Sequence, residues 1–318
     1  MTKHTRKNII LTLETAAVFV GIGFLSVFVN KQDFPAIFKY PVQTLILIFQ
    51  GFWFYRLYIF GHEASHWKLF DNKIINDIIG SIFLFPILTP INIFRKIHNY
   101  HHGFNRKNYK TSCLDTFTTK KLNGLKKIYF YSIWYLAIFA GGMFLHSLVS
   151  VVLFLFIPPF VSRKISPAFN NWTMKNQITA ILLFLSAIGF HSVIYLIFGI
   201  EIYLYVLAFP LLSFAWILSM FVYIFHYRTT VGDATKYNAR SLNRVSFLSW
   251  ILMNFNQHAT HHQKPDISWY DLPGKRIELP EEFRKLNQNT KNMFTAVFQQ
   301  FKGPVIIDES LNKEVVTD

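Results

Sequence analysis

Three short histidine-rich segments constrain this chain more than any other feature. Within a helix, residues at positions i, i+3 and i+4 lie on one face, so histidines at these positions aim their imidazoles in one direction. The segments contain eight of the 12 histidines of the chain. We call them the first, second and third histidine boxes: His62-Glu63-Ala64-Ser65-His66, His98-Asn99-Tyr100-His101-His102 and His258-Ala259-Thr260-His261-His262.

Convergent imidazoles indicate a metal site, because imidazole is a ligand for zinc, copper, iron and nickel. Eight histidines are too many for one tetrahedral zinc ion. The boxes therefore predict two metal ions, with ligands His62, His66, His98, His101, His102, His258, His261 and His262.

The first box also matches the HExxH pattern of zinc proteases, in which two histidines bind zinc and the glutamate acts as the base. Such a site needs one further ligand, whereas the two later boxes supply six histidines. Histidines with only structural roles would not repeat the same spacing. Both interpretations explain the sequence less well than a two-metal site.

Long apolar runs indicate an integral membrane protein. Hydrophobic residues make up 52% of the chain, and 35 residues are Phe. A helix of about 20 apolar residues crosses the hydrocarbon core of a bilayer. Four runs approach or reach this length, and we expect them to be transmembrane helices: 9–29, 41–60, 177–198 and 202–225.

Two other apolar segments are expected to be interfacial or re-entrant. Segment 74–94 connects two boxes that must face one site, and Pro86 and Pro90 interrupt it. Segment 128–157 has basic residues on both flanks, so both of its ends should lie on the same side of the membrane. The expected fold is an all-α integral membrane protein, a single domain over 1–318, with a cytoplasmic cap that carries the boxes.

The net charge of +15 would suggest nucleic acid as the partner of a soluble protein. Here the basic residues flank the apolar runs, so the positive-inside rule explains them without nucleic acid. Both termini, the boxes and the polar region 227–318 are then cytoplasmic. The last span delivers His226 to the same side, which makes it a candidate ninth ligand. Short termini without an organelle signal favour a bacterial inner membrane.

These features resemble those of the membrane-bound fatty acid desaturases. The resemblance extends from Gly61 to about Pro273 and includes the three boxes at the cytoplasmic ends of four spans. It also includes the link Asn76-Asp77-Ile78-Ile79-Gly80 between the first two boxes and Trp269-Tyr270-Asp271-Leu272-Pro273 after the third.

The resemblance implies a non-haem di-iron centre that activates O₂ and removes two hydrogens from a lipid acyl chain. The implied ligands of the two iron ions are the eight box histidines and His226, which matches an isolated histidine near the end of the family's fourth span. Some relatives have an asparagine one turn earlier, where this chain has Val222 and Tyr223. No separate catalytic acid or base is assigned.

The reaction needs two electrons from outside the chain. There is no His-Pro-Gly-Gly haem segment and no cysteine cluster, since Cys113 is the single cysteine. A separate ferredoxin or small cytochrome is therefore the expected electron donor.

Two alternatives remain open. The same scaffold could serve a hydroxylase or ketolase acting on an alkyl, acyl or carotenoid substrate, because both reactions begin with the same hydrogen abstraction. Residues 254–265 also resemble the third box of membrane alkane hydroxylases, but the second box lacks the extra residue found in those enzymes. A non-redox membrane metal-binding protein would need polar residues along its spans, and the spans here are nearly all Phe, Leu, Ile and Val.

Overall fold

The computed structural model describes residues 3–108, 117–119, 122–308 and 313–314. Cys113, part of the basic segment before residue 127 and the end of the C-terminal region lie outside the described residues. The chain forms two compact units. Unit 1 contains Met1–Lys96 and Leu145–Ile217, and unit 2 contains Ile97–Phe144 and Leu218–Asp318.

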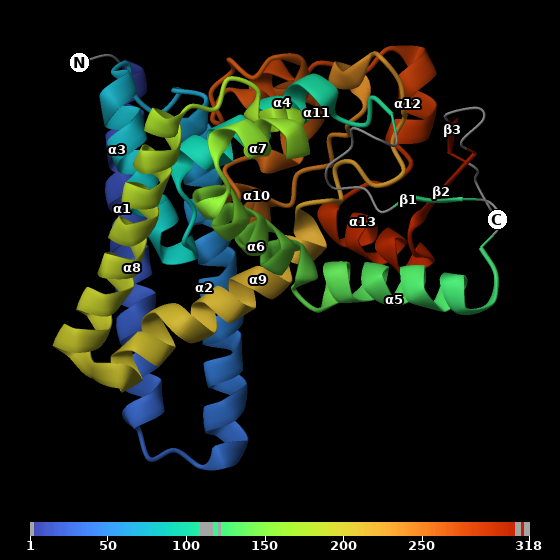
Figure 1. The fold of residues 1–318 in the computed structure, drawn as a ribbon. Coiled ribbons are helices and arrows are strands. Elements are labelled where there is room, and N and C mark those ends of the chain that lie inside the picture. The colour runs from blue at the N-terminus through green and yellow to red at the C-terminus, as the bar shows by residue number, and fades with distance from the viewer. Residues whose placement is uncertain (1–2, 109–116, 120–121, 309–312, 315–318) are drawn as a thin grey trace. The chain divides into compact units, whose positions relative to one another are not determined.

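Unit 1 is built from helices (Figure 1). Helix α2 packs against both α1 and α3. The chain passes between the two units inside three helices, α4, α6 and α9. The helices that lie wholly or partly in unit 1 are α1 (Lys3–Lys31), α2 (Ala36–Ser65), α3 (Lys73–Leu84), α4 (Ile91–Phe104), α6 (Gly142–Phe156), α7 (Pro159–Ile165), α8 (Met174–Tyr203) and α9 (Phe209–Phe221).

Unit 2 combines short helices with one small sheet, which the sequence analysis did not predict. Strand β1 pairs with β2 in parallel, and β2 pairs with β3 antiparallel. The sheet joins residues far apart in sequence, which no local pattern can reveal. The elements of unit 2 are α5 (Gly124–Phe139), α10 (Ser246–Ile251), α11 (His258–Gln263), α12 (Glu281–Asn287), α13 (Met293–Gln299), β1 (Phe117–Thr119), β2 (Val305–Asp308) and β3 (Lys313–Glu314).

Three helical stretches among the described residues are long and apolar enough to cross a membrane: His4–Lys31, Ala36–Ser65 and Met174–Phe221. The number rises to five if each of two bent helix pairs is one span. The helical and apolar character of the chain is therefore as predicted. The predicted spans 9–29 and 41–60 lie within α1 and α2.

The other two predicted spans fall in the third stretch, which is broken near its middle. Gly199 has φ +81°, outside the helical region, and a glycine adopts this conformation at little cost. Figure 1 shows α9 leaving the lower end of α8 in a different direction. Helix α9 ends at Phe221, before the predicted end at 225, so His226 lies in a turn beyond the helix.

A partly buried ion pair connects α1 to α2. The side chain of Arg56 is fully buried, and its Nη2 lies 3.3 Å from Glu14 Oε1. Arg56 Nε also donates to Thr15 Oγ1 over 3.0 Å. Trp53 Nε1 donates to the carbonyl of Thr15 over 3.0 Å. These polar contacts give two apolar helices one defined register, because an unpaired charge in an apolar region is costly.

Gly51 allows α2 to approach α9 closely. A Cβ atom at Gly51 would lie 2.9 Å from the backbone carbonyl carbon of Ser213 and 2.8 Å from Ile217 Cδ1. A backbone atom cannot move away as a flexible side-chain end can. Any larger residue at this position must therefore separate the two helices.

We expect Gly51→Val to lower the free energy of unfolding by about 1–3 kcal/mol, the usual cost of overpacking a close contact. Unfolding in mixed micelles by increasing fractions of sodium dodecyl sulfate measures this. Gly21→Val is the matched control, because a Cβ at Gly21 meets nothing within 4 Å. Equal stability of the two variants would contradict the close approach of α2 and α9.

Candidate metal centre

Four imidazoles of unit 2 form one group that could hold a metal ion. His101, His226, His258 and His262 each offer a nitrogen, and these atoms all lie within 4.8 Å of one another. Nε2 of His258 is 2.9 Å from Nε2 of His226 and 3.1 Å from Nε2 of His262. Nitrogens bound to one ion at about 2.0–2.1 Å lie about 3.0–3.4 Å apart. The spacing therefore fits ligands of a shared ion.

Three further imidazoles of unit 2 form a second group beside the first. Nε2 of His102 lies 3.0 Å from Nε2 of His98 and 3.1 Å from Nε2 of His261. The two groups adjoin, since the rings of His102 and His262 stack with centroids 4.4 Å apart. Unit 2 thus brings together seven of the nine predicted ligands in two adjoining sets.

The second and third boxes contribute to both groups in opposite ways. The second box gives its i and i+4 histidines, His98 and His102, to one group and its i+3 histidine, His101, to the other. The third box gives His258 and His262 to the group of His101, and His261 to the group of His102. The spacing of the boxes predicted convergence on one face. It did not predict this exchange between two groups.

Burial favours the ligating form of these histidines. His226 and His262 are 2% and 5% exposed and lie after the last candidate span. Burial lowers the pKa of His226 well below its usual value, and the neighbouring His101 acts in the same direction. Burial and the neighbouring His102 likewise hold the pKa of His262 low. Both rings are therefore neutral at physiological pH, as metal ligands must be.

The backbone of Asn238 orients His226. Nδ1 of His226 lies 3.3 Å from the carbonyl oxygen of Asn238. A hydrogen bond there places the ring proton on Nδ1 and leaves Nε2 as the ligand atom, the usual arrangement of metal-binding histidines.

Two side chains that the sequence analysis missed support this arrangement. The Nδ2 group of Asn238 donates to the carbonyls of Asn105, Arg106 and Gly232 over 3.0–3.2 Å. Arg106 is fully buried, and its Nη1 donates to the carbonyl of His226 over 2.8 Å and to the hydroxyl of Tyr223 over 3.2 Å.

Arg106 lies in a basic stretch of the sequence, yet its side chain is buried and holds the turn of His226. No local signal distinguishes this arginine from its neighbours Lys107 and Lys110, because its partners come from segments more than 100 residues away. Tyr223, which stands near the position of an asparagine in some desaturases, contacts Arg106 through its hydroxyl.

Short irregular segments fix the third box. Helix α11 begins at His258, after Asn254 with φ +57° and a turn of 3-10 helix. The backbone N–H of Ala259 donates to Ser241 Oγ over 3.1 Å, and the hydroxyl of Thr260 accepts from the N–H of Ile277 over 3.2 Å. The residues between the histidines therefore anchor the box and leave its imidazoles for the metal.

The first box lies at the end of α2 in unit 1. The rings of His62 and His66 have centroids 5.0 Å apart. Nδ1 of His62 lies 3.2 Å from Oε1 of Glu63, which is 4% exposed. A carboxylate that accepts from Nδ1 directs the other nitrogen, Nε2, toward a metal. Glu63 therefore orients its neighbour, whereas the zinc-protease pattern would require it as a base.

The segment after the first box is held by two polar side chains. Asn76 is fully buried; its Nδ2 donates to the carbonyl of Phe70 over 2.6 Å, and its Oδ1 accepts from the N–H of Leu69 over 2.9 Å. Arg95 donates to the carbonyl of Ser65 over 2.9 Å and pairs with Asp77. These contacts give a structural reason for the Asn76-Asp77 pair and for Arg95.

The remaining histidines lie apart from these groups. Among the described residues, His4, His146 and His191 belong to no metal-binding group. Nδ1 of His191 lies 3.4 Å from the Tyr203 hydroxyl. The sequence analysis left all three outside the site.

We expect Asn238→Ala to weaken metal binding by about 10–100-fold, the usual effect of losing an outer partner of a ligand. The variant removes four side-chain hydrogen bonds that position the backbone carbonyl facing His226: three that Nδ2 donates and one that Oδ1 accepts from the hydroxyl of Thr230. Iron retained after dialysis against graded chelator measures the effect. Asn243→Ala, at an exposed position of unit 2, should retain wild-type iron. Equal retention by both variants would show that Asn238 has no part in positioning.

Comparison with known proteins agrees with this geometry. A 12-desaturase of sn-1 oleoyl lipids from Anabaena variabilis is 28% identical over 92 residues, which are 29% of this chain and 24% of that protein. The omega-3 fatty acid desaturase fat-1 of Caenorhabditis elegans is 37% identical over 86 residues, 27% of this chain and 21% of that one. An sn-1 acyl-lipid omega-3 desaturase (ferredoxin) from Synechocystis is 31% identical over 86 residues, 27% and 23% of the two chains.

The matched stretches cover at most about a quarter of these relatives, so they compare only part of each protein. The model of the fatty acid desaturase family matches much more of this chain, residues 40–290, which include all three boxes and His226. The chain therefore belongs to the fatty acid desaturase family.

Proposed function

We propose that this protein is an O₂-dependent membrane desaturase that introduces a double bond into the acyl chain of a lipid. The observation that carries the proposal is the pair of adjoining all-histidine groups in unit 2, in a chain of the desaturase family. Imidazole suits zinc, copper, iron and nickel, and the match to the desaturase family supports iron among them.

The proposed ligands of two iron ions are all nine histidines, including His62 and His66. Four imidazoles are available in the group of His226 and three in the group of His98. His62 and His66 of the first box would complete the proposed set. The Glu63 carboxylate supports this role, because it leaves Nε2 of His62 for coordination. The two units would then act together as one catalytic domain over 1–318.

Bound iron would supply activation of O₂ and abstraction of hydrogen from an unactivated C–H bond. The residues of this chain hold the ions and position the substrate. Nine imidazoles would hold the ions without adding negative charge. The apolar side chains of the spans bind the acyl chain and exclude water, so that one C–H pair stays close to the reacting centre.

The reaction balances only with an electron donor. Two hydrogens from the acyl chain, two external electrons and two protons reduce one O₂ to two waters. Ferredoxin is the donor named for the Synechocystis relative. We propose ferredoxin or a small cytochrome here, since the chain contains a single cysteine and no cluster motif.

The proposed topology has four transmembrane helices, with the boxes and both termini in the cytoplasm of a bacterial inner membrane. The helices α1, α2, α8 and α9 would be the spans, with a turn at Gly199. Segment 74–94 supports an interfacial role, because it folds as α3, a short 3-10 turn and the start of α4, with Leu88 in the left-handed conformation.

The direct test is the fatty-acid profile of cells that express the chain with O₂ and a compatible donor. We expect an acyl chain two mass units lighter that is absent with His258→Ala, whose loss removes a nitrogen close to both His226 and His262. Mass spectrometry locates the double bond. A product that gains oxygen would instead show a hydroxylase or ketolase. No redox product from iron-loaded protein with a working donor would favour a metal-binding protein.

Iron analysis tests the ligand set separately from the reaction. Purified wild-type protein should contain about two iron ions per chain, and His62→Ala should lose occupancy of one site while the other remains. Mössbauer spectra of iron-57 protein distinguish a coupled pair from a single ion. His146→Ala, at an exposed position, should match the wild type. An unchanged spectrum of His62→Ala would exclude the first box as a ligand.

A further inference from the structure

Helix α5 is apolar on opposite faces, and only one of them is covered. Trp134 and Ile138 are fully buried. Opposite them, Leu125, Ile128, Tyr129 and Leu136 are 84%, 63%, 60% and 61% exposed. An amphipathic surface helix would present polar residues on that side. The outer face of α5 therefore lacks the composition of a water-facing surface.

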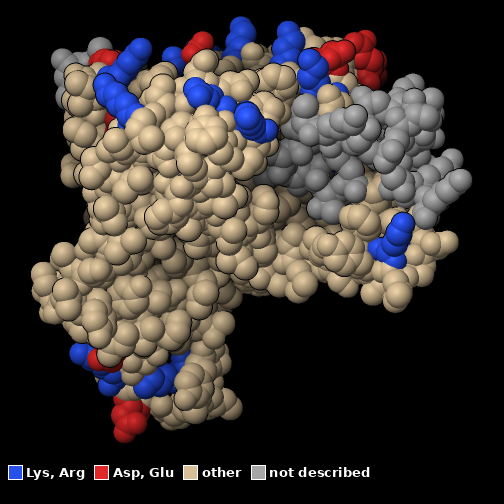
Figure 2. Space-filling view, in the orientation of Figure 1, with Lys and Arg blue, Asp and Glu red and all other residues tan. Residues whose placement is uncertain are grey.

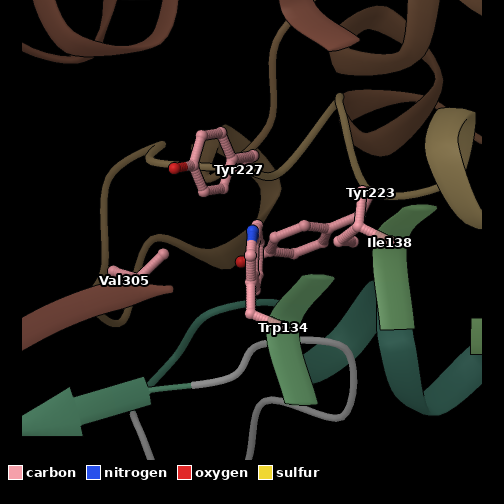
Figure 3. Packing of buried hydrophobic residues seen from close by; sticks show 5 residues of the cluster. All are labelled: Trp134, Ile138, Tyr223, Tyr227 and Val305. Atoms are coloured by element: carbon pink, nitrogen blue, oxygen red, sulfur yellow. The ribbon is translucent and has the colours of Figure 1, made fainter. Parts of the chain in front are cut away.

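The inner face of α5 is firmly packed within unit 2, so the outer face has a fixed orientation. Figure 3 shows Trp134 between Tyr223, Tyr227 and Val305. The ring of Trp134 lies 5.2 Å from that of Tyr227. Its Nε1 donates to the carbonyl of Gln300 over 2.9 Å. Rotation of α5 to bury its outer face would break these contacts.

The C-terminal helix α13 and the turn after it extend the same surface. Tyr135 donates to the carbonyl of Phe301 over 2.9 Å, and the ring of Phe139 stacks on Phe301 with centroids 4.3 Å apart. Phe298 stacks in turn on Phe301. Phe298 and Phe301 are 68% and 55% exposed. We call this surface the α5–α13 face and define it by Leu125, Ile128, Tyr129, Leu136, Phe298 and Phe301.

We propose that the α5–α13 face docks on the membrane, with its apolar side chains in the boundary between lipid headgroups and acyl chains of an anionic leaflet. Clusters of exposed aromatic and aliphatic side chains on a helix are typical of interfacial insertion. Four of its six residues lie on α5, within or just before segment 128–157, which was expected to be interfacial or re-entrant. Phe298 and Phe301 extend the surface into region 227–318, which its sequence marked as polar.

The positive charges around the α5–α13 face favour an anionic lipid surface as its partner. Lys126, Lys127 and Lys302 are exposed at its ends, and helices α5 and α13 with the turn after α13 contain no acidic residue. In Figure 2 the side of unit 2 formed by α5 is tan, with a blue patch at one end of the helix and no red. Lysines can extend to lipid phosphates while their neighbours enter the apolar layer.

The experiment measures the depth of single nitroxide labels in vesicles. All variants carry Cys113→Ser, which removes the one native cysteine. Phe298→Cys and Leu125→Cys report on the face. Lys285→Cys, at an exposed position of α12 in the same unit, is the water-facing control, and Leu182→Cys on α8 is the lipid-facing control. The full-length protein is reconstituted in phosphatidylcholine vesicles with or without phosphatidylglycerol.

For each nitroxide label, the collision rate with O₂, which concentrates in lipid, is divided by the collision rate with a water-soluble nickel chelate. We expect the ratio at Phe298 and Leu125 to shift toward that of Leu182 and away from that of Lys285. Replacing Lys126 and Lys127 by Gln should reduce the shift only in vesicles with phosphatidylglycerol. This readout needs no turnover, so it is independent of the proposed reaction.

Two results would overturn the proposal. A ratio at Phe298 and Leu125 equal to that at Lys285 would place the face in water. Spectral broadening that disappears on dilution with unlabelled protein would show that a second copy covers the face. Equal iron content and elution volume across the variants confirm that each is folded.

Discussion

The close approach of seven imidazoles in unit 2 is the constraint on which the structure depends. Six of these rings have nitrogens 2.9–3.1 Å from a neighbour's nitrogen, in two adjoining sets. Protonation would place like charges in contact inside a buried region, and hydrogen bonds between neutral rings can satisfy only some of the nitrogens. A bound cation resolves this conflict for every ring at once. The free-energy cost of burying these imidazoles side by side therefore supports a bound metal ion in the cluster.

The surrounding structure keeps these rings in place with ordinary polar contacts. Asn238 and Arg106 fix the turn of His226, while Ser241 and Thr260 fix the third box. In unit 1, Asn76 and Arg95 fix the segment around the first box. Each partner holds a backbone group or a ring orientation and leaves the ligating nitrogens available. Rigid support of this kind is what a metal centre needs for repeated turnover.

The convergence of the histidines within each box could be predicted because its signal is local. Helical spacing within each box and the length of each apolar run depend on neighbours along the chain. The role of Arg106 could not be predicted in this way, because Tyr223 and His226, its partners, lie far along the sequence. The same holds for the sheet that joins β1 to the C-terminal strands, and for the division of the second and third boxes between two groups. The break at Gly199 falls in the gap between the predicted spans 177–198 and 202–225, which is also a local signal.

The division of the boxes also limits how the centre can vary. Because His98 and His102 belong to one group while His101 belongs to the other, the second box sets the separation of its contributions to the two groups by the rise and rotation of a single helical turn. An insertion within this box would rotate the later histidines by about 100°, and both groups would lose members together. The two groups are thus structurally coupled.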